Sequence, residues 1–520
     1  MKHKALTHFS ADRLIYASFC APYKTKFYGC LGILALAGTM FTACSDDDDN
    51  NGKNNASTAV WTVNGGINAC DHLLFTESDK AGSKEVNDNG TQIGNGDQEF
   101  VFTGKQTLKK GTYILKGWVY IADGAELTIE PGTVIKGDKD TKAALIAERG
   151  GKLIAQGSET QPIVFTSEQA PGSRRPGDWG GIIICGKART NATEQQIEGG
   201  PRTKHGGNDD NDNSGVLSYV RIEFAGYPFA TDQEINGLTL GSVGKQTKID
   251  HVQVSYSNDD SYEWFGGTVD CKYLIAYKGW DDDFDTDNGF SGHVQYGLSI
   301  RDPKIADKSM SNGFESDNNA KGTNADPHTS AVFSNITFVG PKAGAADFVN
   351  DASYITAGSM NPNNGSGLGR FQSGMQIRRD SHLSCFNSVI VGWPVGLILD
   401  NDLGDTQGAA TSALLKLQNI YMTNVDAIGT DKNKVLSNPE NDSFSAKFFL
   451  AQPGNVYSQA ATGWFDMTGY RPLAGSPLLT GASFTDALLA GFEKVAYVGA
   501  FGGTDWTANW TNFDPQNTNY

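Results

Sequence analysis

Acidic residues recur at regular intervals in the middle of this 520-residue sequence. When three aromatic–acid pairs that start at residues 262, 284 and 314 are aligned, their acids form one column: Glu263, Asp285 and Glu315. The same alignment places Asp287 with Asp317. Carboxylates about 5 Å apart on neighbouring strands would repel each other by roughly 3 kcal/mol at an effective dielectric constant of 20. Such columns therefore need compensation.

Three kinds of compensation are open. A bound Ca²⁺ suits a set of hard oxygen ligands, a basic partner would pair with the acids, and protonation would remove the charge of one member. The candidate Ca²⁺ ligands are Glu263, Asp285, Glu315, Asp287 and Asp317. The nearest basic residues in the sequence, which could compensate instead, are Lys272, Lys278 and Arg301. A solvated acidic face without a ligand is the alternative to a calcium site.

These acids must be positioned by short strands. From about residue 110 the chain is a series of β-branched runs broken by Gly, Asn and Asp, and no amphipathic helix interrupts them, which excludes a βα architecture. The strands that start at His251 and Tyr273 are 22 residues apart, which fits one coil of a parallel β-helix, whereas a propeller blade would need about 40 residues. Stacked coils would bring like positions into ladders about 4.8 Å apart.

Four segments carry a resemblance to a known family: residues 130–135, 176–181, 219–226 and 260–267. They resemble a group of Bacteroidetes cell-surface lipoproteins that are similar to the right-handed, pectate-lyase-like parallel β-helix superfamily. The resemblance runs from about residue 110 to the C-terminus and implies an all-β fold, a right-handed parallel β-helix. It implies no particular activity, because β-helices host lyases, hydrolases, adhesins and phage tailspikes.

Polysaccharide-cleaving β-helices carry acids or bases on one exposed strand face. Two carboxylates can hydrolyse a glycosidic bond, and the catalytic candidates here are Asp282, Asp285 and Asp287. A lyase would use Ca²⁺ to neutralise a uronate and a Lys or Arg to take the α-proton. The Gly-His-Gly element of polygalacturonases is absent, because Gly292-His293 is followed by Val294. Whether the chain is an enzyme therefore stays open.

The N-terminus has the order of a bacterial lipoprotein signal. A basic stretch precedes the apolar run 29–41, which is too short to span a membrane comfortably. It ends in Phe41-Thr42-Ala43-Cys44, which resembles a lipobox, so Cys44 is the expected lipidation site. The acidic run Asp46–Asp49 resembles a surface-export signal. We therefore expect anchorage in the outer membrane by lipid, facing the exterior.

Composition sets the remaining boundaries and partners. The expected organisation is a signal peptide at 1–43, an acidic flexible tether at 44–60, an N-terminal cap region at 61–110, the parallel β-helix at 111–430 and a C-terminal cap at 431–520. The formal net charge of −17 argues against nucleic acid as a partner. The cysteines outside the leader are far apart, so one or two disulfides or isolated buried thiols are both open.

Two functions are compatible with these observations. The first is a surface β-helix that binds glycans or partner proteins, and the second is a polysaccharide lyase or glycoside hydrolase that acts at the acidic face. The aromatic residues Trp264, Trp280 and Trp393 could stack on sugar rings if they are exposed, or pack at the corners of the coils.

Overall fold

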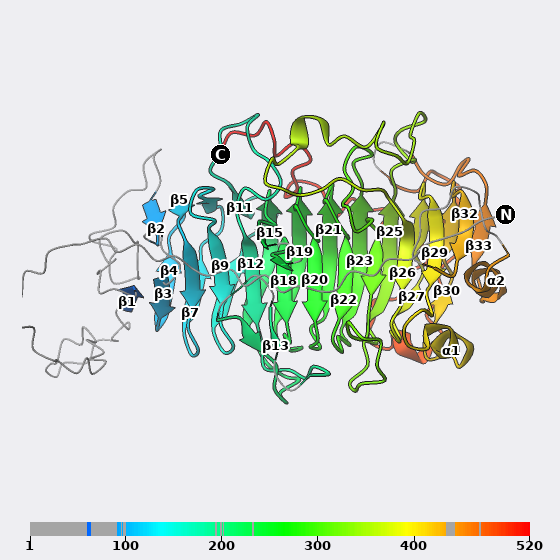
Figure 1. Ribbon diagram of the computed structural model, residues 1–520, viewed down its shortest axis with the longest axis horizontal. Coiled ribbons are helices and arrows are strands. Elements are labelled where there is room, and N and C mark those ends of the chain that lie inside the picture. Colours follow the sequence, from blue (N-terminus) through cyan, green and yellow to red (C-terminus); the bar gives the residue numbers. More distant parts are fainter. Residues whose placement is uncertain are drawn as a thin grey trace, which may run out of the picture. The chain divides into compact units, whose positions relative to one another are not determined.

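The computed structural model describes residues 60–63, 91–94, 96, 100–192, 195–197, 200, 202–230, 233–432, 442–466 and 470–520. The signal peptide, Cys44, the Asp46–Asp49 run and almost all of the tether lie outside these residues. Within them the strands pair mainly in parallel between successive coils (Figure 1). The predicted all-β fold, a parallel β-helix, is confirmed.

One sheet forms the first wall of the coils. Its strands pair in parallel from one coil to the next. They are β3 (Phe100–Thr103), β6 (Trp118–Ile121), β9 (Ala144–Ala147), β12 (Gly181–Cys185), β18 (Leu238–Gly241), β20 (Tyr262–Phe265), β22 (Phe284–Asp287), β24 (Phe314–Ser316), β26 (Ser373–Ile377), β29 (Val395–Leu399) and β32 (Ala427–Thr430).

The second sheet folds around the other two walls. Its short strands are β2 (Thr91–Ile93), β4 (Lys105–Leu108), β5 (Thr112–Leu115), β7 (Glu126–Ile129), β8 (Val134–Gly137), β10 (Lys152–Gln156), β11 (Ile163–Ser167), β27 (Ser384–Phe386), β28 (Val389–Val391), β30 (Leu417–Gln418), β31 (Tyr421–Thr423) and β33 (Val456–Ser458). Its long strands are β15 (Gly215–Glu223), β19 (Lys248–Ser255), β21 (Cys271–Tyr277), β23 (His293–Ile300) and β25 (Val332–Val339). Each long strand spans both walls, as β25 shows by pairing with β27 and then with β28.

A bend in each long strand makes this possible. Tyr219, His251, Tyr273 and Tyr296 have φ values of 53°, 51°, 57° and 65°, which is uncommon for residues other than glycine. Their rings stack from coil to coil with centroid separations of 4.3, 4.4 and 4.8 Å. We call these four residues the aromatic column. The same ring contact is repeated at this corner from coil to coil. The stacking offsets part of the backbone strain.

The interior of the coils is a continuous hydrophobic core. Residues of alternating strand positions point inward, including Phe284, Phe314 and Phe333, which pack on one another. Cys185, Cys271 and Cys385 are free and buried, so of the two expectations for the cysteines the described residues bear out buried thiols. Cys70 lies outside the described residues.

The coils begin before the predicted boundary at residue 111. Strands β3 and β4 already pair in parallel with β6 and β7 of the next coil. At the N-terminal end β1 (Val60–Val63) pairs antiparallel with β3 and covers its free edge. The predicted N-terminal cap region, residues 61–110, therefore contains both a covering strand and the first strands of the stack.

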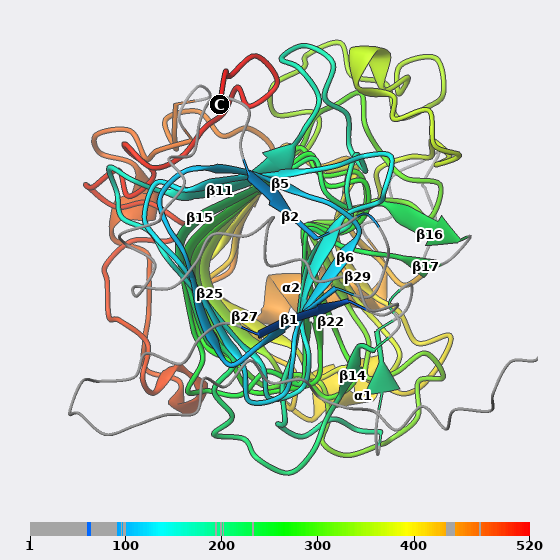
Figure 2. The ribbon, with the colours of Figure 1, turned by 90° about the vertical axis from the view of Figure 1, so that its left-hand side faces the viewer.

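The predicted C-terminal cap, residues 431–520, divides into two parts. Helix α2 (Phe444–Ala451) closes the last coils, because Phe449 joins the core and Ser445 donates its hydroxyl to the Asp431 carboxylate. Residues 470–520, which we call the C-terminal tail, run back along the outside of the stack (Figures 1 and 2). The last residue, Tyr520, accepts a 2.8 Å hydrogen bond from Lys136 at its backbone oxygen. Only the first part therefore acts as a cap.

Side chains of the stack hold the tail by its backbone. Gln253 donates to the Asn512 carbonyl at 2.8 Å and accepts from the Asn512 amide at 2.8 Å. Trp510 packs edge-on against Tyr219 and His251 of the aromatic column. The tail thus covers the outward rings of this corner.

The remaining elements lie in the loops. They are the strand pairs β13 (Gln195–Gln196) with β14 (Lys204–His205) and β16 (Pro228–Ala230) with β17 (Gln233–Glu234), the helix α1 (Thr406–Thr411), and the 3₁₀ turns η3 (Gly358–Met360), η4 (Pro477–Leu479) and η5 (Ala487–Leu489). In the part of the chain that the structure describes, no helix has the length and apolar character needed to cross a membrane.

Candidate functional site: an acidic face

The predicted acids lie on the outside of the first wall. In β20 and β22 the aromatic residues Tyr262, Trp264 and Phe284 point into the core, so the alternate residues point outward. The outward acids of three successive coils and of the turns before them form one surface, which we call the acidic face. It consists of Asp259, Asp260, Glu263, Asp281, Asp282, Asp285, Asp287, Glu315 and Asp317.

The register of this face agrees with the alignment of the sequence. Glu263 pairs with Asp285 across β20 and β22, and Asp285 pairs with Glu315 across β22 and β24. The Asp317 amide donates to the Thr286 carbonyl at 2.9 Å, which continues the same register toward Asp287. The two predicted columns of acids are therefore present in the structure.

The acids of the turns bind backbone amides of the next coil. The Asp282 amide donates a 2.8 Å hydrogen bond to Asp260 Oδ1, and the Asn312 amide donates in turn to Asp282 Oδ1. Asp281 accepts a 2.5 Å hydrogen bond from the Ser309 hydroxyl. The turns are thus linked in series along the stack, and each link leaves other carboxylate oxygens available.

Two arginines neutralise the C-terminal side of the face. Arg378, which follows β26, donates to Glu315 and, at 2.8 Å from Nε to Oδ1, to Asp317. Arg379 donates to the second Asp317 oxygen at 2.6 Å. Glu315 and Asp317 were predicted as calcium ligands, and in the structure both carboxylates contact these guanidinium groups. Each is already paired with a fixed positive charge.

The N-terminal side of the face is less well compensated. Oxygen atoms of Asp260, Glu263 and Asp285 lie within 4.8 Å of one another. The Oδ1 atoms of Asp285 and Asp281 are buried and have no hydrogen-bond partner. Oxygen ligands on opposite sides of a Ca²⁺ ion are separated by about 4.8 Å, since each bond is about 2.4 Å long. The spacing of this trio therefore fits one Ca²⁺ ion.

Burial and mutual repulsion raise the pKa values of several carboxyls of the acidic face. Burial, followed by repulsion from Glu315 and Asp317, raises the pKa of Asp285 well above its usual range. Burial and repulsion from Asp259 and Asp285 do the same to the pKa of Asp260. Burial raises the pKa of Asp282, with further increases from Asp281 and Glu315. Without a cation, several of these carboxyls are therefore held closer to the neutral form.

The basic residues nearest in sequence do not compensate this trio. Lys272 pairs with Glu493 of the tail at 2.6 Å, and Lys278 lies 3.6 Å from Asp302. Arg301 is buried against Asp283 at 2.9 Å and reaches the face only through the Asp281 carbonyl, at 2.6 Å. Proximity in the sequence did not identify Arg378, because this residue follows β26, which comes after a long insertion.

Two further comparisons with the sequence predictions concern this surface. Asp260 was not among the predicted metal ligands, although it lies 22 residues before the catalytic candidate Asp282, the same step that separates Glu263 from Asp285. The tryptophans Trp264, Trp280 and Trp393 are all buried. They pack in the core and at the corners and are not available to stack on sugar rings, which was one of the two possibilities.

Comparisons with known proteins give one match. Residues 101–466 match the model of a family described as a pectate-lyase like beta helix domain. A search of curated proteins and a search of solved structures returned no match. The matched range covers the coils from β3 to the region just after β33 and includes the whole acidic face.

Proposed function

The chain belongs to the family of pectate-lyase-like β-helix domains, and from this premise we propose that it is a surface protein that binds acidic glycans through Ca²⁺. The Ca²⁺ ion is held at the acidic face by Asp260, Glu263 and Asp285. The stack of coils serves as a rigid support, because each acid is fixed by the strand register of its own coil.

The observation that carries this proposal is the close spacing of the three carboxylates Asp260, Glu263 and Asp285. Three carboxylates whose oxygens lie within 4.8 Å, one of them with a buried oxygen that has no hydrogen-bond partner, form a site for a hard cation. Arg378 and Arg379 pair with Glu315 and Asp317, and the pKa of Asp285 stays raised although Arg378 acts to lower it. A Ca²⁺ ion supplies the missing charge.

The cation also explains which ligand the face accepts. The protein carries a formal net charge of −17, and the face alone would repel a polyanion. A Ca²⁺ ion with unfilled coordination positions attracts carboxylate and hydroxyl oxygens of a uronate. The proposed ligand is therefore a polysaccharide that contains uronic acids, bound only when Ca²⁺ is present.

Binding to immobilised polygalacturonate and alginate tests this function, with neutral dextran as the reference polymer. We expect retention of the chain with Ca²⁺ and its loss with EGTA. Asp285→Asn removes retention, whereas Asp140→Asn, at an exposed position away from the face, leaves it unchanged. Equal retention with and without Ca²⁺, or by all three polymers, would contradict the proposal.

Catalysis is the second candidate, and the raised pKa values of adjacent carboxyls favour it. A carboxyl held neutral near Asp285 can donate a proton to a leaving oxygen, while an ionised neighbour acts as base or nucleophile. Release of reducing ends or unsaturated uronates from the same polysaccharides is the measurement. Turnover that disappears in Asp285→Asn supports a hydrolase or lyase, and binding without turnover supports the binding protein.

The proposed location is the outer face of the outer membrane, with a lipid on Cys44. Acyl chains would contribute about 0.8 kcal/mol for each buried methylene, and the acidic residues 46–49 lie in the predicted tether, residues 44–60. Metabolic labelling with palmitate and its loss in Cys44→Ala tests the anchor. Cleavage of the chain by protease added to whole cells tests the exterior orientation.

A further inference from the structure

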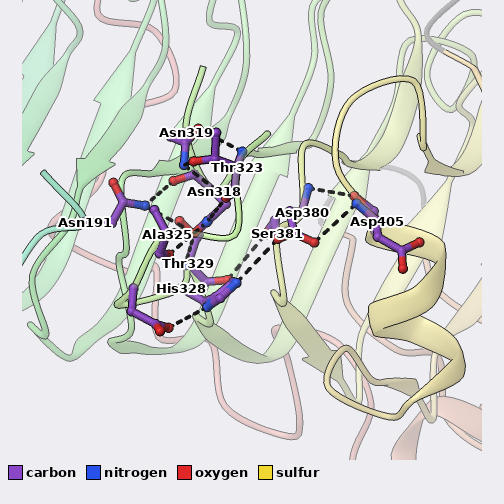
Figure 3. A network of polar contacts seen from close by, with 12 residues as sticks. Asn191, Asn318, Asn319, Thr323, Ala325, His328, Thr329, Asp380, Ser381 and Asp405 are labelled. Atoms are coloured by element: carbon purple, nitrogen blue, oxygen red, sulfur yellow. Dashed lines mark hydrogen bonds and ion pairs between the residues drawn. The ribbon is translucent and has the colours of Figure 1, made fainter. Parts of the chain in front are cut away.

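A second cluster of metal-binding side chains lies at another corner of the stack, between β24 and α1. His328 belongs to the loop before β25, and Asp380 and His382 belong to the turn between β26 and β27. One nitrogen or oxygen atom of each of the three lies within 4.8 Å of the others. Figure 3 shows the His328 side chain directed toward Asp380.

The His328 imidazole faces a carboxylate at each nitrogen. Its Nδ1 atom is 2.8 Å from Asp326 Oδ1, a distance at which Nδ1–H donates to the carboxylate. In the neutral tautomer that carries its proton on Nδ1, Nε2 has a lone pair. Nε2 is buried, lacks a hydrogen-bond partner and lies 3.4 Å from Asp380 Oδ2. Two electron-rich atoms therefore face each other.

A metal ion between these two atoms would resolve this contact. Two ligands of a tetrahedral zinc ion, each about 2.0–2.1 Å from the metal, are about 3.3 Å apart, which agrees with the observed 3.4 Å. A carboxylate that holds the outer nitrogen of a metal-binding histidine is a common supporting contact. Asp326 provides that contact here.

The other carboxylate of the cluster is also fixed. Asp380 Oδ1 accepts from the Asp405 amide at 3.3 Å, and the Asp380 amide donates to the Thr406 hydroxyl at 3.0 Å (Figure 3). These contacts with the start of α1 leave Oδ2 directed toward His328. The Asp380 side chain is 11% exposed, so a charge there favours a partner.

The loop that carries His328 is held by one asparagine. The Asn318 side chain donates to the carbonyls of Thr323 at 2.7 Å and Ala325 at 3.0 Å, and accepts from the Thr329 amide at 2.8 Å (Figure 3). Asn191 donates to the Asn318 carbonyl from a distant part of the chain. His328 is therefore presented by a loop whose backbone is already tied to the stack.

We propose that His328, Asp380 and His382 form a Zn²⁺ site, with a water molecule as the fourth ligand. Two imidazoles and one carboxylate suit Zn²⁺ better than Ca²⁺, which prefers oxygen ligands alone. None of the three ligands belongs to the acidic face. The site joins the loop before β25 to the turn after β26 and so links two successive coils.

One movement accompanies binding. The His328 and His382 rings are stacked with centroids 4.2 Å apart and an angle of 7° between their planes. A single ion cannot lie in the planes of two stacked rings, so His382 turns about its Cβ–Cγ bond when the metal enters.

Titration with zinc chloride tests the site. The full chain, without a histidine tag, is stripped with EDTA and dialysed into saturating Ca²⁺ so that the acidic face does not compete. We expect one Zn²⁺ per chain in isothermal titration calorimetry, with binding at least tenfold weaker in His328→Gln, Asp380→Asn and His382→Gln. His293→Gln is the matched control, because this imidazole pairs with Asp270 at another corner.

Two measurements keep the result decisive. Circular dichroism of each metal-free variant confirms that the β-helix has formed, and the visible absorption of Co²⁺ reports tetrahedral coordination in the parent chain and its loss in His328→Gln. Equal zinc affinity for His328→Gln and His293→Gln would overturn the proposal. A parent chain that binds no Zn²⁺ would also overturn it.

Discussion

The backbone amide of Asp282 donates a 2.8 Å hydrogen bond to the carboxylate of Asp260, its counterpart one coil earlier. An acid of one coil thereby helps to fix the turn of the next, although both acids carry the same charge. The contact explains how the stack tolerates acids at successive levels: backbone amides take up part of the negative charge.

Asp285→Asn is expected to stabilise the chain when Ca²⁺ is absent. The substitution removes a charge that Glu315 and Asp317 repel, and the free energy of unfolding should rise by roughly 1–3 kcal/mol. Urea denaturation in EGTA measures it, with Asp140→Asn as control. A loss of stability in EGTA would show that Asp285 is not under net repulsion.

The same repulsion predicts a dependence on pH. Because the pKa values of Asp260, Asp282 and Asp285 are raised in the folded chain, the folded state binds protons more tightly than the unfolded state. Their contribution to stability is complete below the ordinary aspartate pKa of 3.8 and is lost as the pH rises through the raised values.

Urea titrations of the parent chain and Asp285→Asn from pH 4 to 8 isolate this effect from other titrating groups. In EGTA the stability of the parent relative to the variant should fall as the pH rises. Saturating Ca²⁺ should reduce the slope. If the stability of the parent chain relative to Asp285→Asn rose with pH in EGTA, the raised pKa of Asp285 would be contradicted.

Arg378→Ala should destabilise the fold by roughly 3 kcal/mol, because it removes the guanidinium group that contacts Glu315 and leaves Asp317 paired with Arg379 alone. The side chains involved are at most 17% exposed, so water replaces the arginine only in part. Arg370→Ala, at an exposed position, is the control. Adding Glu315→Gln to Arg378→Ala should recover part of the loss, and no recovery would argue against charge as its cause.

Gln253→Ala should loosen the C-terminal tail without unfolding the coils. The side chain makes two 2.8 Å hydrogen bonds with the Asn512 backbone, each worth about 1 kcal/mol. Hydrogen–deuterium exchange followed by mass spectrometry should show faster exchange in the peptide containing Asn512. Exchange in β12 should stay unchanged, as should both regions in Gln156→Ala, whose side chain is exposed.

The fold was predictable because its information is periodic. The 22-residue step from Tyr262 to Phe284 sets both the coil length and the register of the acids. The same step places Asp260 beside the coil of Asp282. Local periodicity thus predicted which acids share a surface, since parallel register repeats from coil to coil.

The compensation of the face was not predictable in the same way. Arg378 lies one coil after Glu315, and this coil contains a long insertion. The position of Arg378 beside Glu315 therefore depends on how the insertion folds. The position of the C-terminal tail could not be predicted from periodicity either. The contact between Asn512 and Gln253 joins the stack to a segment that does not repeat. Residues that contact one another outside the repeating unit leave no periodic signal.

The thermal midpoint of unfolding with and without Ca²⁺ tests the central claim most directly. With Ca²⁺ at a hundred times its dissociation constant, a folded-state site contributes about 2.7 kcal/mol, which for a chain of this size raises the midpoint by about 3 °C. We expect this rise for the parent chain and for Asp140→Asn, and its loss in Asp285→Asn. No rise in the parent chain, or an equal rise in Asp285→Asn, would contradict a calcium site at the acidic face.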